Sequence, residues 1–315
     1  MHLTPIELLR RGRSAWRRRA ASGGLVLAYH RVTTLDRDPL RLATSPRHFA
    51  AQLEMIRRDG VPMTLAAMID AAKTKTLPPR AVAVTFDDGY ADNLHEALPL
   101  LERYEVPATI FLTTSALDSG REFWWDELEQ VLLHEHGNPR WTIEHAIPSD
   151  RHRAYHDLSL RLRVASPAVR DRAVRALAAQ HGVRLQMRST HRPLTREETR
   201  TLAASPLISI GSHACSHVAL STLAPADQAR EIDEARRTLE QLIRRAVTHL
   251  AYPYGGPAEV SRQVGQVARE AGITIGCTTE PGCVGPDTDP LHVPRLLMRD
   301  WSGSEFARHW GEWAA

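Results

Sequence analysis

The sequence has few cysteines, few lysines and no long apolar run, and each shortage argues against a class of protein. Its three cysteines, Cys215, Cys277 and Cys283, form no CxxC pair. An odd number without paired spacing argues against a disulfide framework and is typical of a cytoplasmic protein. No stretch of 18 apolar residues occurs, so we expect no transmembrane helix. Lys73 and Lys75 are the only lysines, a bias toward arginine that we interpret as background composition.

Neither sign of charge is in large excess. The chain has 40 Lys and Arg against 37 Asp and Glu, a net charge of +3. This balance argues against a nucleic-acid binder. The positive surplus is local, because residues 1–19 carry a net charge of +5 and the rest of the chain a net charge of −2.

The basic segment at residues 1–22 is set apart from the rest of the chain. It does not resemble a signal peptide, because Pro5 and Glu7 interrupt its apolar stretch and its arginines follow that stretch. Two interpretations remain open: a frayed, solvated terminus, or a short basic amphipathic helix on an anionic membrane surface. We therefore expect a cytoplasmic protein, and under the second interpretation one held on the inner face of the membrane.

Seven short apolar, β-rich runs alternate with helical patterns from residue 24 onward. Most of these runs lack polar alternation, which is typical of parallel strands buried on both faces. They span residues 25–29, 81–86, 108–113, 207–210, 247–252, 273–277 and 293–298. Such alternation predicts an α/β fold, a closed or nearly closed (β/α) barrel over residues 23–312. A doubly wound open sheet is the alternative.

The helices between these runs carry their own start and stop signals. One helix is predicted with Ser45 as its N-cap, Pro46 as its first residue and Gly60 as its stop. A second begins at Pro225 with apolar residues at helical spacing. The alternation of strands and helices is interrupted over about residues 122–198, which are helix-like and contain no clear strand. We interpret them as a helical insertion after the third strand and not as a separate domain.

Polar residues follow several of the predicted strands. His30 follows the first run, Asp87 and Asp88 the second, and His213 and His217 the fourth. Because the carboxyl ends of parallel strands meet at one rim, these side chains should converge. One carboxylate with two imidazoles forms a metal-ligand set with open positions, as hydrolysis requires. The second carboxylate would serve as a general base.

Each of these signals is weak by itself. An Asp-Asp-Gly segment is more often a turn than a metal site, and His-x-x-x-His is common on helices. A Tyr-Pro-Tyr-Gly turn at residues 252–255 follows the fifth run as well. All three at the strand ends of one sheet are much harder to explain by structure alone.

These motifs resemble those of the polysaccharide deacetylase family, the NodB-homology group of carbohydrate esterases. The resemblance lies in residues 85–90 (Thr-Phe-Asp-Asp-Gly-Tyr), 211–217 and 251–255, and extends in order from Tyr29 to about Trp310. Residues 29–32, 123–126 and 293–295 are also similar to a branch associated with bacterial exopolysaccharide gene sets. The resemblance implies a distorted (β/α) barrel with about seven strands, in line with the runs counted above.

The resemblance also implies roles for individual residues. Asp87 would be the general base that activates the attacking water. Asp88, His213 and His217 would hold a divalent metal, with Zn²⁺ as the expected ion. The backbone N–H of Tyr254 would stabilise the oxyanion of the tetrahedral intermediate. The products would be acetate and a free amine on the sugar.

Two departures from the family pattern leave roles to be filled. The third motif usually starts with an Arg that orients the catalytic Asp, and here Ala251 stands at that position. Arg295, in the seventh run, could supply this charge from another direction. The usual Leu-x-His motif, which provides the general acid, is absent near the C-terminus. His30 is the first candidate for that acid and His292 the second, although both could be packing residues.

Aromatic residues near the motifs are candidates for contacts to sugar rings. Trp124 and Trp125 lie where the third strand's loop enters the insertion, and Tyr90 and Tyr252 adjoin the motifs. Aromatic faces stack on sugars, which makes these four the expected substrate-binding residues. The other interpretation is that the tryptophans, with Phe123, anchor the insertion to the barrel.

The sequence therefore predicts a metal-dependent hydrolase that removes N-acetyl groups from an amino sugar. Its expected partner is an N-acetylated polysaccharide or a lipid-linked glycan, with no nucleic acid. The competing hypothesis is a carbohydrate-binding protein that kept the barrel and lost turnover, which Ala251 and the missing Leu-x-His motif would favour.

Overall fold

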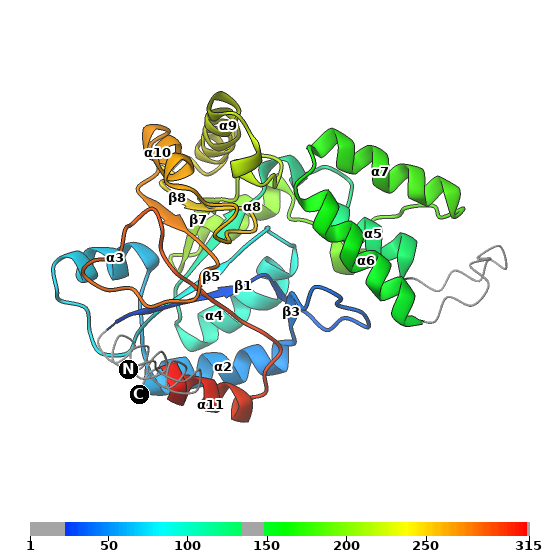
Figure 1. The fold of residues 1–315 in the computed structure, drawn as a ribbon. Coiled ribbons are helices and arrows are strands. Elements are labelled where there is room, and N and C mark those ends of the chain that lie inside the picture. Colours follow the sequence, from blue (N-terminus) through cyan, green and yellow to red (C-terminus); the bar gives the residue numbers. More distant parts are fainter. Residues whose placement is uncertain (1–22, 134–147, 314–315) are drawn as a thin grey trace, which may run out of the picture.

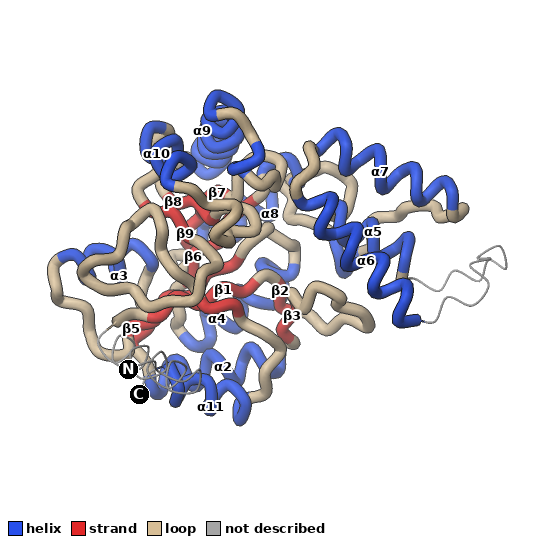
Figure 2. The backbone as a smooth tube through the Cα atoms, viewed as in Figure 1, coloured by secondary structure: helices blue, strands red, loops and turns tan. Residues whose placement is uncertain are grey.

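The structure is a computed structural model that describes residues 23–133 and 148–313. Its centre is a parallel sheet with the strand order β10-β1-β5-β6-β7-β8-β9 (Figure 2). The strands are β1 (Leu25–Tyr29), β5 (Ala81–Phe86), β6 (Ala108–Leu112), β7 (Ile208–Ser212), β8 (His249–Ala251), β9 (Ile275–Cys277) and β10 (Leu296–Leu297). One two-residue strand, β4 (Val61–Pro62), adds to this sheet by pairing with β5, whereas β2 (Arg31–Val32) and β3 (Ala43–Thr44) form a separate two-stranded sheet.

The two ends of this sheet approach each other through the last strand segment. A parallel bridge joins Cys277 of β9 to Val293, and β10 then pairs with β1. Because the strands follow one another around the sheet without a reversal, the (β/α) barrel prediction is confirmed and the doubly wound alternative is excluded. Each of the seven predicted runs contains a strand, although β8, β9 and β10 are shorter than their runs.

The strands of the barrel wall are buried on both faces. In β1, Leu25 and Leu27 pack in the cluster that contains helix residues such as Phe49. Between them, Val26 belongs to a second cluster with Met68 and Phe111. All residues of β1, β5 and β6 are buried, which explains why their sequences show no polar alternation.

Helices surround the sheet in Figure 1. Their bounds are α2 (Pro46–Asp59), α3 (Leu65–Lys73), α4 (Leu98–Tyr104), α9 (Pro225–Ile243), α10 (Arg262–Glu270) and α11 (Gly303–Trp313). Helix α2 begins after Ser45 and is capped by Gly60, and α9 begins at Pro225, as predicted. The Ser45 hydroxyl makes no capping bond and instead donates to Asp300. In the described part of the chain, no helix combines the length and apolarity that crossing a membrane requires.

The chain between β6 and β7 forms the predicted helical insertion. Its helices are α5 (Trp124–Leu132), α6 (Pro148–Arg163), α7 (Pro167–Gln180) and α8 (Arg196–Ala204). Helices α5 to α7 project to one side of the barrel (Figure 1) and share an apolar core that includes Leu128, Tyr155 and Val174. Helix α8 packs against β7 and α9 and so belongs to the barrel wall. The basic segment, with its predicted membrane contact, lies outside the described residues.

Candidate active site

The candidate site residues follow the carboxyl ends of neighbouring strands, as predicted. His30 follows β1, Asp87 follows β5, His213 follows β7 and Tyr254 lies three residues after β8. Parallel pairing brings these strand ends to one rim of the barrel. His30 lies close enough to Asp87, Asp88 and His213 for their charges to shift its pKa.

Asp87 is held in a buried ion pair with Arg295. Arg295 donates from both terminal nitrogens to the two carboxylate oxygens, each at 2.7 Å, and its Nε donates to the Thr278 carbonyl. Neither side chain is more than 2 % exposed. Burial by itself would raise the pKa of Asp87, but Arg295 outweighs it and holds that pKa below its usual range. The carboxylate is therefore ionised at neutral pH, and the positive charge beside it comes from Arg295 and not from the motif position that Ala251 holds.

The turn after Asp87 aims the second carboxylate in another direction. Asp88 has a positive φ of 72° and Gly89 one of 86°. A Cβ on Gly89 would lie 2.5 Å from the Leu112 side chain, so this position requires glycine for both conformation and space. The Asp-Asp-Gly segment is thus a turn, and the same turn separates the two carboxylates into different surroundings.

Asp88, His213 and His217 form a group that could hold a metal ion. Their candidate ligand atoms all lie within 4.8 Å of one another. The Nε2 atoms of His213 and His217 are 3.5 Å and 3.2 Å from Asp88 Oδ1. That oxygen is buried, and none of the described residues donates a hydrogen bond to it. A buried carboxylate oxygen that faces two imidazoles without a donor matches the chemistry of a divalent cation site.

Both imidazoles are suited to act as ligands because they are neutral. His213 Nδ1 lies 2.8 Å from the Ala251 carbonyl and donates to it, which leaves the lone pair on Nε2 facing Asp88. Burial lowers the pKa of His213, and it lowers the pKa of His217 to about 3. Residues 213–217 form a compact loop, which we call the histidine loop.

The two candidates for the general acid differ in position. His30 lies near the carboxylates, and burial lowers its pKa although Asp88 and Asp87 oppose this effect. His292 instead contacts Asp289, with its Nδ1 at 3.1 Å from the carboxylate. Of these two candidates, His30 is therefore the one that lies at the rim, directly after β1.

Tyr254 contributes its backbone and its ring to the same region. Its φ is 64°, and no hydrogen bond between described residues has its N–H as the donor. The ring packs edge-on against His217, with 4.7 Å between centroids. Burial raises the pKa of its hydroxyl to about 12, so the side chain is a neutral wall and the backbone N–H is the group open to a ligand.

A cleft of about 180 Å³ opens beside the metal-ligand group. Its lining includes Thr113, Ser115, Trp124, Arg170 and His217. Trp124 is half-buried and forms part of the wall of the cleft. The cleft reaches the imidazole of His217.

The structure corrects the expectation for three other aromatic residues. Trp125 is buried, stacks on Phe123 and donates its Nε1–H to the Tyr90 hydroxyl at 2.8 Å. Tyr90 is fully buried and donates to Asp126 at 2.7 Å. Tyr252 is also buried, and its hydroxyl donates to the Leu291 carbonyl. These side chains serve the core and the anchoring of the insertion, because their polar atoms are already paired inside the protein.

Two residues that touch the histidine loop were missed from the sequence. Arg170 of α7 and Glu231 of α9 bond to opposite sides of the loop backbone. Arg170 precedes the buried Val174 and Ala178 by four and eight residues, which places it on the apolar face of α7. A charged residue on such a face was the signal available. Glu231 carries no comparable signal.

The buried Asp126 carboxyl predicts a pH-dependent stability. Burial raises its pKa to about 8, although Arg31 and the Tyr90 hydroxyl oppose the shift. A raised pKa stabilises the folded state at low pH and loses this contribution as the pH rises through the folded value. The free energy of unfolding should therefore fall by on the order of 4 kcal/mol between about pH 5 and pH 8.

Asp126→Asn tests this expectation, because the amide stays neutral and can still accept from Tyr90. Urea unfolding across this pH range should show a smaller pH dependence in Asp126→Asn than in the wild type. Asp157→Asn, at an exposed position of the same insertion, is the control. An equal pH dependence in Asp126→Asn and the wild type would contradict the prediction.

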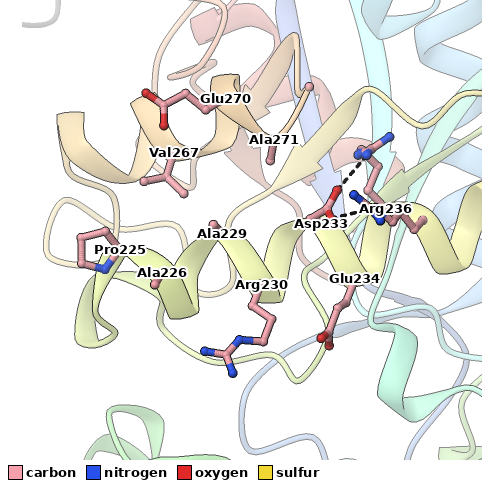
Figure 3. A pocket seen from close by; sticks show the side chains of 12 residues that line it. Pro225, Ala226, Ala229, Arg230, Asp233, Glu234, Arg236, Val267, Glu270 and Ala271 are labelled. Atoms are coloured by element: carbon pink, nitrogen blue, oxygen red, sulfur yellow. Dashed lines mark hydrogen bonds and ion pairs between the residues drawn. The ribbon is translucent and has the colours of Figure 1, made fainter.

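A wide groove between α9 and α10 contains none of the candidate site residues (Figure 3). Its charged side chains pair with each other: Asp233 accepts from Arg236 at 2.7 Å and from Arg237 at 2.8 Å. The groove holds neither the paired carboxylates nor the imidazoles of the rim, so the candidate chemistry belongs to the rim of the barrel.

Comparisons with known proteins agree with this geometry. Residues 74–158 and 164–276 match the family model described as polysaccharide deacetylase, which covers more than half of the chain. A Bacillus subtilis protein, YxkH, named as a candidate polysaccharide deacetylase, is 22% identical over 301 residues, which span 94% of this chain and 79% of that protein.

Two further matches extend over most of the chain. A Staphylococcus aureus poly-β-1,6-N-acetyl-D-glucosamine N-deacetylase is 20% identical over 303 residues, 92% of this chain and 83% of that protein. The solved structure of the Streptococcus pyogenes deacetylase PplD in complex with acetate is similar in fold, with a TM-score of 0.62 and 16% identity. That match covers 91% of this chain and 97% of PplD.

Proposed function

The chain belongs to the polysaccharide deacetylase family, and from this premise we propose that it is a metal-dependent N-deacetylase of an N-acetylated amino sugar. The single observation that carries the proposal is that two adjacent carboxylates have different surroundings. Asp87 is held ionised by Arg295, and the neighbouring Asp88 faces two neutral imidazoles with an oxygen that lacks a donor. Asp87 is therefore suited to act as the base and Asp88 to bind a cation, and both lie at the end of β5.

Asp88, His213 and His217 are the residues that would hold the metal, with Zn²⁺ as the ion suited to one carboxylate and two imidazoles. When bound, such an ion polarises the amide carbonyl and lowers the pKa of water. Asp87 accepts a proton from the attacking water, and Arg295 keeps its carboxylate oriented. The free N–H of Tyr254 donates to the oxyanion. His30 then relays to the leaving amine the proton that Asp87 took from the water, so that acetate and the free amino sugar are released.

The substrate we propose is an N-acetylated polysaccharide that enters through the cleft beside Trp124. The name of the S. aureus relative supports a polymer of N-acetylglucosamine. A lipid-linked glycan carries the same acetamido group, and the oligosaccharide assay below does not require the lipid. The competing function, a binding protein without turnover, loses one of its two arguments because Arg295 supplies the charge that Ala251 lacks.

Acetate release from N-acetylglucosamine oligomers tests the proposed function. We expect the purified chain to release acetate, to stop after dialysis against a chelator, and to resume when Zn²⁺ is restored, because the cation site is emptied and refilled. His213→Ala, which removes one ligand, should neither retain the ion nor release acetate. Oligomers that bind without any acetate release at any metal loading would favour the binding protein.

A further inference from the structure

The backbone of the histidine loop has a conformation that needs support from other residues. Ala214 has a φ of 61° and His217 one of 52°. A residue other than glycine is unfavourable in this left-handed region, and such conformations persist where surrounding groups hold them in place. His217 is itself one of the proposed metal ligands, so whatever holds the loop also sets the direction of that imidazole.

One side of the loop is held by a carboxylate from the barrel. Glu231 of α9 accepts from the backbone N–H groups of Cys215 and Ser216, at 3.0 Å and 2.9 Å. It also accepts from the Ser216 hydroxyl at 2.7 Å. The N–H groups of the loop are therefore fixed from α9.

The opposite side is held by an arginine from the insertion. Arg170 of α7 donates to the carbonyl oxygens of His217 and Ser216, at 2.9 Å and 3.0 Å. The same guanidinium donates to the Tyr254 hydroxyl at 3.3 Å and lies over the Trp124 ring, 5.7 Å from its centroid. Arg170 thus joins the metal-ligand loop to two walls of the cleft.

The surroundings of Arg170 are unusual for a structural arginine. Its side chain is 2 % exposed, and no carboxylate of the described residues lies within ion-pair distance of it. Burial lowers its pKa as a result. A buried cation without an acidic partner is costly to the fold, so this arginine is poorly explained by stability alone. Its donors are used on the carbonyl groups of the histidine loop.

We propose that Arg170 is a positioning residue, which fixes the His217 imidazole toward Asp88 and so makes the helical insertion a working part of the metal site. The inference rests on the proposed function, because it assumes that Asp88, His213 and His217 bind the metal. Losing Arg170 releases the two carbonyl groups and lets the loop relax from its left-handed conformation. The metal site then loses affinity, because His217 is no longer held in place.

The test compares substitutions of Arg170 with one at Arg172, an exposed arginine two residues along the same helix. Full-length variants are titrated with Zn²⁺ in competition with a chromophoric chelator, and their Co²⁺ complexes are examined by visible absorption. Arg170→Gln should raise the metal Kd by roughly 10- to 100-fold, the usual effect of losing a group that orients a ligand, and should change the Co²⁺ spectrum. Arg170→Lys keeps the charge and one donor nitrogen, so its metal Kd should lie between those of the wild type and Arg170→Gln. The metal Kd of Arg172→Gln should match that of the wild type.

Wild-type Kd and spectrum in Arg170→Gln would overturn the inference, even if KM for the oligomer rises, since that result would make Arg170 a substrate contact. If Arg170→Gln does not fold, Arg170→Lys carries the comparison, and an unchanged Kd in that variant overturns it equally. Asp88→Asn separates this failure from that of the proposed function. Loss of metal in Asp88→Asn with tight binding in the Arg170 variants refutes only the role of Arg170, whereas tight binding in Asp88→Asn refutes the metal site itself.

Discussion

Replacing Asp87 with Asn should lower kcat by roughly 10²- to 10⁴-fold, the usual contribution of a positioned general base. The amide cannot accept the proton from the attacking water. Metal content should stay at the wild-type level, because the proposed ligands are Asp88, His213 and His217. Single-turnover acetate release with metal content measured on the same sample checks both parts.

Asp87→Asn also leaves Arg295 without its ion pair, so a general loss of structure must be separated from a loss of chemistry. Asp233→Asn serves as the control, because it breaks a carboxylate–arginine pair in the groove of Figure 3, away from the rim. It should keep the wild-type kcat. An Asp87→Asn protein that holds its metal and turns over at the wild-type rate would show that another group is the base.

Replacing Arg295 with Met should destabilise the protein by about 3–5 kcal/mol, the cost of leaving one partner of a buried pair uncompensated. Both terminal nitrogens of Arg295 bond to Asp87 at 2.7 Å, and Arg295 is fully buried. Urea unfolding at neutral pH measures the loss. Arg308→Met, at an exposed position of the following helix, should be close to neutral.

The pH dependence of Arg295→Met gives a second, signed readout. In the wild type, Arg295 holds the pKa of Asp87 below the unfolded value, so the pair stabilises the protein at neutral pH and is lost only in strong acid. In Arg295→Met, the opposing effect of Arg295 is gone, and burial, which is the largest single influence, shifts the pKa of Asp87 upward. Lowering the pH from about 7 to about 5 should therefore narrow the stability gap between variant and wild type. A double variant, Asp87→Asn with Arg295→Met, should be less destabilised than the sum of the two single changes.

Much of the fold could be predicted because its signals are local. Each of the seven apolar runs lies within a short window of sequence, as do the helix signals from Ser45 to Gly60. The helical break after the third strand is recognised because it contains no such run. Each of these features corresponds to an element of the structure. The ends of the strands were less predictable. Strands β8 to β10 are shorter than their runs, because an apolar run records burial and not hydrogen bonding to a neighbouring strand.

The candidate site shows a similar division. The motif residues Asp88, His213 and His217 gather at the rim because strand ends gather there. Tyr90 and Tyr252 adjoin the same motifs, yet their hydroxyls bond inside the core, and a sequence pattern does not say which way a side chain points. Arg170 was missed because its contact depends on how the insertion docks on the barrel, which no local pattern encodes.

The pairing of Asp87 with Arg295 has a consequence for synthesis of the chain. The two residues are separated by 208 positions, and Arg295 arrives with the last segment that closes the barrel between β9 and β1. A ribosome-bound chain that has not yet reached residue 295 can already form the turn that carries Asp87, but it lacks the arginine that pairs with that carboxylate. The proposed base is therefore fully assembled only after the segment between β9 and β1 has been made and has folded, and a cut in the chain before residue 295 would separate the two partners.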